Sequence, residues 1–161
     1  MTGHAPPSPD ALRMDAAALD AFIAAAFPAI PAARRPRTLL AKPGHVRMLL
    51  TPDAASLRPG NIVSGPTLMG LADHAAYALV LSHIGPVAMA VTSSLNFQFL
   101  RACPPEPVTA DARLLRLGKR LAVIDVRIWT ATEDRCVGQA VVTYAIPDGG
   151  NIVPSPDVDI P

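Results

Sequence analysis

The stretch SGPTLMGLADHAAYALVLSHIG, residues 64–85, decides how this chain folds. Either Ser64 or Gly65 can cap a helix here, and Pro66 suits its first position because the N–H that proline lacks would be unpaired there anyway. The apolar side chains that follow cover almost the whole circumference of such a helix. A helix that is apolar on all sides is buried. The sequence therefore predicts a central helix over residues 66–84, covered by the rest of the chain.

Four segments with strand character follow this helix, and the short breaks CPPEP, LGKR and TEDR separate them. Short breaks favour hairpins and an antiparallel sheet. A long antiparallel sheet can bury one apolar helix by curling round it, which gives an α+β fold. Strands are expected over 87–101, 108–117, 121–131 and 136–146, two shorter extended pieces within 37–51, and an extra N-terminal helix over 11–26.

The totals for the 161 residues are those of one domain with a real core, since half of the residues are hydrophobic and 17% are charged. We expect a domain over 10–146, with flexible tails over 1–9 and 147–161. A net charge of +1 gives no general field for nucleic acid or a membrane surface. No apolar run reaches the ~18 residues of a membrane span, and no secretory signal begins the chain. Two cysteines are too few for a disulfide framework, which favours a reduced, cytoplasmic location.

Asp73 is the unusual residue, because it places a carboxylate in the middle of the apolar helix. A buried carboxylate must be paired, hydrogen-bonded or neutralised. Of its helical neighbours three and four positions away, only Tyr77 could offer a hydrogen bond. Asp73 is thus poorly compensated within its own helix, which is typical of a functional group. The alternative is a structural carboxylate that residues elsewhere in the fold satisfy.

Three pieces, SGPTLMGLADHAAY, AVTSSLNFQFLR and ARLLRLGKRLAVIDVRI, follow one another in this order. Together, within residues 58–146, they resemble the hotdog-fold thioesterases of the PaaI-like (phenylacetyl-CoA thioesterase) group. The resemblance implies a curved antiparallel sheet around a central helix, with subunits paired sheet to sheet and active sites at their interface. It also implies hydrolysis of acyl-CoA without a metal or other cofactor. The expected partners are an acyl-CoA substrate and further copies of the chain, as a homodimer or a dimer of dimers.

The resemblance makes Asp73 the catalytic residue, as general base or as nucleophile. Thioester hydrolysis also needs a donor for the oxyanion, and a helix N-terminus supplies free N–H groups. Pro66 cannot donate, so Gly65 N–H is the expected donor, although Gly65 could be a plain turn glycine. The two residues are eight positions apart, about 12 Å along a helix. If both act on one bond, they should come from different subunits, which predicts a composite site in a dimer.

Four further positions are expected around this centre. The resemblance assigns Thr92 to placing the water, although it could be an ordinary β-branched strand residue. Asn61 and Ser64, just before Gly65, are expected to help bind substrate, although a loop asparagine often serves a turn. Lys119 and Arg120, in the LGKR turn, are expected near the CoA phosphates, and the alternative is a solvated turn. 

The chain also departs from the family pattern. The common motif before the helix is His-Gly-Gly, whereas this chain has Ser64-Gly65-Pro66, and Arg58 stands where many relatives have asparagine. The missing histidine motivates an alternative function, a non-catalytic acyl-CoA binding protein on the same fold. A hotdog dehydratase is disfavoured, since no histidine stands at a matching position.

The remaining histidines and the cysteines carry no catalytic pattern. His74 points about 100° away from its neighbour Asp73, and His45 and His83 have no partners at metal-ligand spacing, so all three are expected to be structural or solvent-facing. Neither cysteine has a visible base partner, which argues against a thiol nucleophile.

Overall fold

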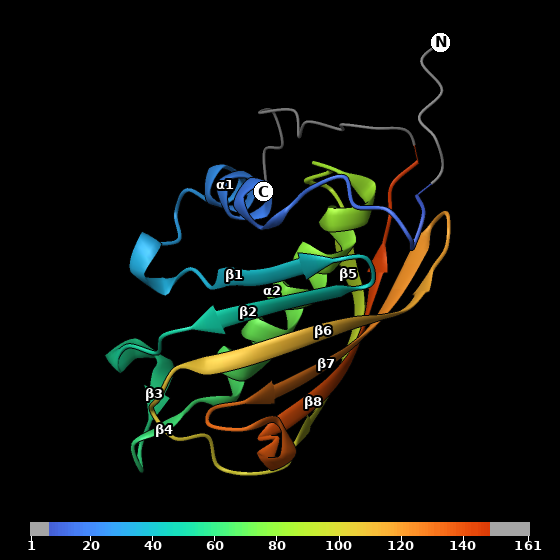
Figure 1. Cartoon of the computed structure of the whole chain (residues 1–161). Helices are drawn as coiled ribbons and strands as arrows, with labels where there is room; N and C mark the ends of the chain where they lie inside the picture. The colour runs from blue at the N-terminus through green and yellow to red at the C-terminus, as the bar shows by residue number, and fades with distance from the viewer. Residues whose placement is uncertain (1–6, 149–161) are drawn as a thin grey trace, which may run out of the picture.

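The computed structural model of this protein describes residues 7–148, in which a six-stranded antiparallel sheet curls around one long helix, α2 (Figure 1). The strands lie in the order β1-β2-β6-β7-β8-β5. Their bounds are β1 Arg37–Lys42, β2 His45–Leu50, β5 Val91–Phe99, β6 Val108–Leu117, β7 Leu121–Trp129 and β8 Gly138–Ala145, while β3 Leu57–Arg58 and β4 Ile62–Val63 form a separate hairpin. The helices are α1 Ala16–Ala26 and α2 Gly65–Ile84, with short turns of 3-10 helix at Ala32–Arg34, Ala54–Ser56 and Glu133–Arg135. This confirms the predicted α+β arrangement.

The central helix α2 begins one residue earlier than predicted. Ser64 holds the N-cap position with extended backbone, and its Oγ accepts the Thr67 N–H at 3.4 Å. Gly65 therefore opens the helix and Pro66 follows it. At the other end Gly85 has a φ of 90°, a left-handed conformation that favours glycine and ends the helix.

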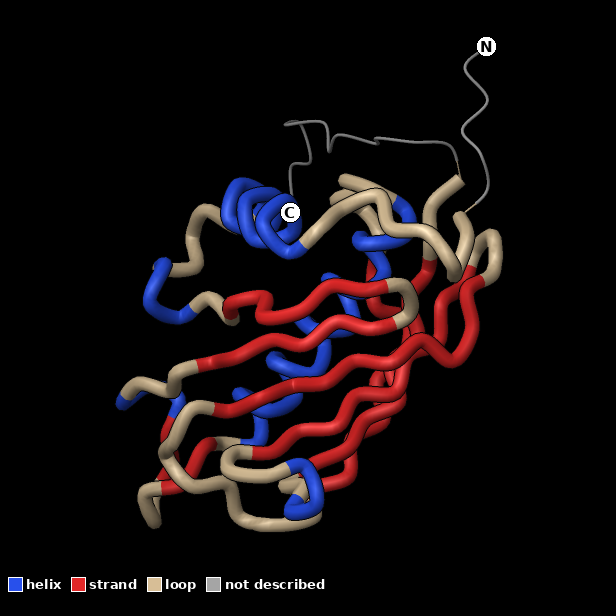
Figure 2. The backbone as a smooth tube through the Cα atoms, viewed as in Figure 1, coloured by secondary structure: helices blue, strands red, loops and turns tan. Residues whose placement is uncertain are grey.

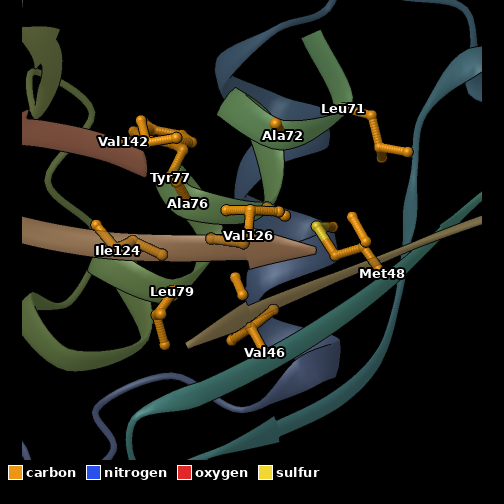
Figure 3. Close-up of a cluster of buried hydrophobic side chains, with 14 of the residues drawn as sticks. Val46, Met48, Leu71, Ala72, Ala76, Tyr77, Leu79, Ile124, Val126 and Val142 are labelled. Carbon is orange, nitrogen blue, oxygen red and sulfur yellow. The ribbon is translucent and has the colours of Figure 1, made fainter. Parts of the chain in front are cut away.

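The core lies between α2 and the concave face of the sheet, as Figure 3 shows. Leu79 of α2 and Ile124 and Val126 of β7 have no exposed surface. Burial of each such side chain stabilises the fold by about 1.5–3 kcal/mol. This packing explains why the sheet curls: alternate strand positions supply a continuous apolar surface that follows the helix.

The sheet does not cover α2 completely, so the prediction of a helix buried on all sides is wrong for one stripe. Pro66, Met69 and Gly70 are exposed and Asp73 is half-buried. These positions are three to four residues apart, so they share one face of the helix. A Cβ added at Gly70 would meet no atom within 4 Å, and Met69 keeps 39% of its surface exposed. The stripe ends at the carboxylate.

Helix α1 covers one edge of the sheet. It begins at Ala16, later than the predicted residue 11, because the N–H groups of Arg13 and Met14 both donate to the Ser82 carbonyl of α2. The Asp20 carboxylate accepts the Thr38 hydroxyl at 2.6 Å, which ties α1 to β1. 

The opposite edge of the sheet is open. Strand β5 pairs with β8 on one side and has no strand on the other within residues 7–148 (Figure 2). It is shorter than the predicted 87–101, because turn hydrogen bonds from Val87 and Ala90 occupy the residues before it. Val91 and Phe99 of β5 keep 50% and 54% of their surfaces exposed. A long edge strand with exposed apolar side chains invites pairing with another chain.

The expected tails lie mainly outside the described part, which omits residues 1–6 and 149–161.

Candidate active site

Asp73 meets two hydroxyl groups from the sheet. Thr92 Oγ1 donates to Asp73 Oδ1 at 2.6 Å, and the Tyr144 hydroxyl donates to the same oxygen at 2.8 Å. The Tyr144 hydroxyl also lies 3.2 Å from the Asp73 backbone carbonyl. Within residues 7–148 no hydrogen bond reaches the other carboxylate oxygen, Oδ2. One oxygen of the carboxylate is thus fixed and the other can accept a proton.

Strand register brings the two hydroxyl groups together. Thr92 of β5 and Tyr144 of β8 are direct cross-strand partners, and the register shifts by one residue between Thr92 and Ser94. Such a bulge re-aims side chains at the edge of a sheet. Burial raises the pKa of Tyr144 far above its usual value, as does the nearby Asp73 charge, so the phenol stays protonated and donates.

These contacts correct the expectation drawn from the helix alone. Tyr77, the one candidate donor on α2, turns its hydroxyl to the Ala88 carbonyl at 3.1 Å instead. Asp73 is half-buried rather than enclosed, and its compensation comes from β5 and β8. Both donors are neutral hydroxyl groups, so among the described residues the carboxylate is hydrogen-bonded but not ion-paired.

A cavity of about 420 Å³ opens beside Asp73. Thr92 and Tyr144 share its lining with residues of α2, the Ala88–Val91 region and the segment after α1. No lysine or arginine is among the described residues that line it. We call it the Asp73 cavity; it is mainly apolar, with the carboxylate at one side.

A second cavity, of about 500 Å³, lies at the N-terminus of α2 and is lined by Gly65. We call it the Gly65 cavity. Arg58 and Arg101 also line it, together with apolar side chains that include Phe99. A Cβ added at Gly65 would lie 3.3 Å from the Phe99 ring, so glycine allows a close approach here. The lining residues described include no carboxylate.

Gly65 supplies the free donor of the first helical turn. Pro66 has no N–H, the Thr67 N–H donates to Ser64 Oγ, and the Leu68 N–H donates to the Ser64 carbonyl. The Gly65 N–H has no acceptor in the described part of the chain. It therefore lies at the positive end of a 20-residue helix with its hydrogen free for a ligand.

The structure keeps the other predicted residues apart. Ser64 serves as the cap, and Asn61 occupies an exposed turn with a φ of 55°, outside the lining of both cavities. Lys119 and Arg120 are exposed in the β6–β7 turn, where Arg120 forms an ion pair with Asp148. This turn lies at the Thr92 end of the sheet, because Leu121 and Val91 both pair with Ala145. Their substrate contacts stay predictions.

The histidines are embedded in structure. His83 is buried, with Nδ1 near the Ser8 and Ala11 carbonyls and Nε2 accepting the Gly44 N–H at 3.0 Å. His45 Nε2 lies 2.6 Å from the buried Asp111 carboxylate. 

His74 lines the Asp73 cavity, and its Nε2 is buried without a hydrogen-bond partner among the described residues. Burial lowers the pKa of His74, against the pull of the Asp73 and Asp20 charges. The ring is therefore neutral near pH 7.

The two cysteines are poorly placed to act as nucleophiles. Both thiols are buried, and burial raises the pKa of Cys103 to about 11, helped by the Glu106 charge. Among residues 7–148 no three His, Cys, Asp or Glu side chains gather as a metal site would require.

Tyr144 and Arg101 are the site residues that sequence reasoning missed. Tyr144 is one of many alternating residues on a strand, and only the β5–β8 register brings it to Asp73. Arg101 follows β5, donates to the Cys136 carbonyl at 2.8 Å and lines the Gly65 cavity. The one available signal was a tyrosine at a core-facing position of a strand, a residue whose hydroxyl needs a partner when buried.

Comparisons with known proteins agree with this architecture. The Thioesterase superfamily profile matches residues 60–137. The chain is 34% identical to a crystal structure from Silicibacter sp. TM1040 described as a "putative thioesterase", with a TM-score of 0.78 and coverage of 87% of this chain and 96% of that one. 

Two more distant structures show the same fold. The PaaI protein of the E. coli phenylacetic acid degradation operon is 23% identical, with a TM-score of 0.63 over 71% of this chain and 80% of that one. The Streptococcus mutans UA159 protein smu.793, solved with acetyl CoA bound, is 19% identical, with a TM-score of 0.63 over 73% and 93%. None of the helices within residues 7–148 has both the length and the apolar composition needed to cross a membrane.

Proposed function

Since this chain belongs to the thioesterase superfamily, as a PaaI-like hotdog protein, we propose that it hydrolyses an acyl-CoA thioester to the free acid and CoA. The observation that carries the proposal is the Asp73 carboxylate, with Oδ1 held by two hydroxyl groups and Oδ2 open. A structural carboxylate has no need of a free oxygen at a cavity. A general base needs one, together with a fixed orientation.

In this mechanism Asp73 Oδ2 takes a proton from water while the water oxygen attacks the thioester carbonyl carbon. Gly65 N–H donates to the carbonyl oxygen as it becomes the oxyanion. When the tetrahedral intermediate collapses, the C–S bond breaks, and Asp73 returns the proton to the departing CoA sulfur. Atoms and charge balance without a metal. Thr92 and Tyr144 keep the carboxylate aimed throughout.

The two groups of this mechanism act from different subunits. Asp73 and Gly65 line separate cavities of the chain, and eight residues of helix separate them by about 12 Å. The open edge of β5 and the uncovered stripe of α2 form adjacent surfaces that a second copy can cover. A two-fold pairing there would put Asp73 of one protomer opposite Gly65 of its partner. The acetyl CoA bound by the smu.793 protein supports a CoA thioester as ligand.

The first test is free-thiol release from a panel of acyl-CoAs, with wild type beside Asp73→Ala and Asp73→Asn. Asparagine keeps an oxygen for Thr92 and Tyr144, so this variant should fold and still lose activity. We expect kcat to fall by about 100-fold or more, as for the loss of a general base. The matched control is Asp125→Asn, because Asp125 pairs with Gln139 across the sheet, outside both cavities. Equal rates in all four proteins would remove Asp73 from the mechanism.

The donor at Gly65 can be removed with little damage to the helix. Proline is well tolerated at the first helical position, and Ser64 already has a ψ of 151°, which suits the residue before proline. Gly65→Pro therefore deletes the N–H and adds a Cβ against Phe99, whereas Gly65→Ala adds the same Cβ and keeps the donor. We expect kcat to fall by about 100-fold in Gly65→Pro and much less in Gly65→Ala. Equal losses would mean that crowding, not the donor, matters.

The second candidate is a non-catalytic acyl-CoA binding protein, and the observation that favours it is Ser64-Gly65-Pro66 in place of His-Gly-Gly. Tight binding of an acyl-CoA without thiol release across the panel would establish this function instead.

A further inference from the structure

The segment that follows α1 forms a wall of the Asp73 cavity. Phe27 and Ile30 line this cavity although they lie more than 40 positions before Asp73 in the sequence. Phe27 packs edge-on against Tyr77, with ring centroids 5.9 Å apart and an interplanar angle of 79°. Tyr77 in turn lies 5.8 Å from the ring of Tyr144, which holds the carboxylate. A row of three aromatic rings thus leads from the end of α1 to the reacting group.

Hydrogen bonds hold the backbone of this wall in place. The Phe27 N–H donates to the Ile23 carbonyl at 3.0 Å and so caps α1. The Phe27 carbonyl accepts the Ile30 N–H at 3.2 Å and Arg35 Nη2 at 3.4 Å. Both backbone groups of Phe27 are therefore engaged, yet the residue keeps 42% of its surface exposed. A held backbone with an exposed apolar ring suits a contact with a ligand.

The chemistry of the cavity indicates which part of an acyl-CoA it takes. The CoA moiety carries phosphates and amides, which need basic or polar partners. The described lining contains no lysine or arginine, and His74 is neutral there. The acyl chain is the apolar part of the substrate and the part that continues past the carbonyl. A volume of about 420 Å³ lies within the usual range for ligand pockets.

We propose that Phe27 and Ile30 form the acyl-chain wall of the Asp73 cavity and thereby set the length of acyl group that the protein accepts. This inference rests on the proposed function for its use in catalysis, but the binding of the chain can be measured without turnover. Phe27 has the larger side chain and is more exposed than Ile30, so it is the main determinant of acyl-chain length.

The test compares butyryl-CoA with decanoyl-CoA for wild type, Phe27→Ala and Phe27→Trp. Removal of the ring should raise the decanoyl-to-butyryl ratio of kcat/KM by about tenfold, the scale at which apolar pockets discriminate chain size. The larger indole of Phe27→Trp should lower the same ratio. Opposite shifts are diagnostic, since general loosening of the fold cannot produce both.

Phe22→Ala is the matched control, because Phe22 lies on α1, just before the wall, and packs against the core without lining the cavity. It should lower stability and leave the chain-length ratio unchanged. A shift in Phe22→Ala equal to that in Phe27→Ala would overturn the proposal, as would an unchanged ratio in both Phe27 variants.

Calorimetric binding of the non-hydrolysable thioethers S-butyl-CoA and S-decyl-CoA separates this inference from the proposed function. If wild type releases no thiol but Phe27→Ala still shifts the ratio of the two affinities, the proposed function fails and the acyl wall stands. If wild type binds neither thioether, the acyl wall is overturned as well.

Discussion

The two cavities along α2 differ in what they offer to a thioester. The Asp73 cavity holds a carboxylate with a free oxygen, apolar walls and no described basic residue. The Gly65 cavity holds a free backbone N–H and two arginines and no described carboxylate. In the proposed mechanism the first supplies the base and the second the oxyanion donor. Neither cavity then has both groups, which is why we propose a working unit larger than one chain.

The cavities also differ in how they are built. Gly65 owes its free N–H to local sequence, since the Ser64 cap and Pro66 flank it at the start of one helix. Asp73 owes its orientation to partners 19 and 71 positions away. Local features can be read from a sequence, whereas the environment of Asp73 depends on the whole sheet.

The largest expected effect tests whether the two cavities form one active site across subunits. A heterodimer of Asp73→Asn and Gly65→Pro chains, isolated through two different tags, has one site with both groups intact and one with neither. Its activity should be about half that of wild type, although each homodimer retains about 1% or less. Thiol release measures this directly. An inactive heterodimer would mean that Asp73 and Gly65 act from the same chain, which contradicts the proposed composite site.

A smaller effect should follow from weakening the hold on Asp73. Tyr144→Phe removes one of the two donors to Oδ1 and leaves Thr92 in place. A hydrogen bond to a charged group contributes about 1.5–3 kcal/mol, so kcat should fall at least about tenfold with little change in KM. Thr92→Val should act similarly and Thr92→Ser much less, because serine keeps the hydroxyl. If Tyr144→Phe changed KM alone, Tyr144 would bind substrate rather than orient the carboxylate.

Variants in the β6–β7 turn test whether the CoA phosphates bind there. The double variant Lys119→Ala/Arg120→Ala should raise KM about threefold and leave kcat unchanged, as for exposed ionic contacts. The effect should shrink as salt is added. Arg116→Ala is the control on the same hairpin, since Arg116 is exposed but precedes the turn. Equal KM values for all three proteins would move the CoA phosphates elsewhere, with Arg58 and Arg101 as the next candidates.

The smallest effect concerns stability, and it tests the protonation of His74 in the Asp73 cavity. Burial holds the pKa of His74 below its usual 6.5, so the unfolded chain takes up this proton more readily than the folded one. The corresponding stability is present above about pH 6.5 and is lost as pH falls below it, with a slope of at most about 1.4 kcal/mol per pH unit. His74→Gln should flatten the free energy of unfolding, measured with urea, between pH 7 and pH 5.5. An unchanged slope would show that folding does not change the proton affinity of His74.

Much of the fold followed from sequence patterns of short range. The strand over Val108–Leu117 was predicted with its observed bounds, and α2 with an error of one residue. The alternation of a strand and the apolar pattern of a helix recur every few residues, so one misleading residue hardly changes the prediction of the element. The start of α1 was predicted too early, because nothing in the sequence near Arg13 signals its bond to the Ser82 carbonyl.

The sequence by itself determined the central helix, the expected donor at Gly65 and the presence of an acid among apolar residues. Only the tertiary structure decided that Thr92 and Tyr144 share one oxygen of Asp73, that Tyr77 does not, and that Phe27 closes the same cavity. The physical reason is the range of the interactions. Helix contacts join residues three or four positions apart, whereas strand register is set by the packing of the whole sheet, and a slip of one residue would turn Tyr144 to the other face.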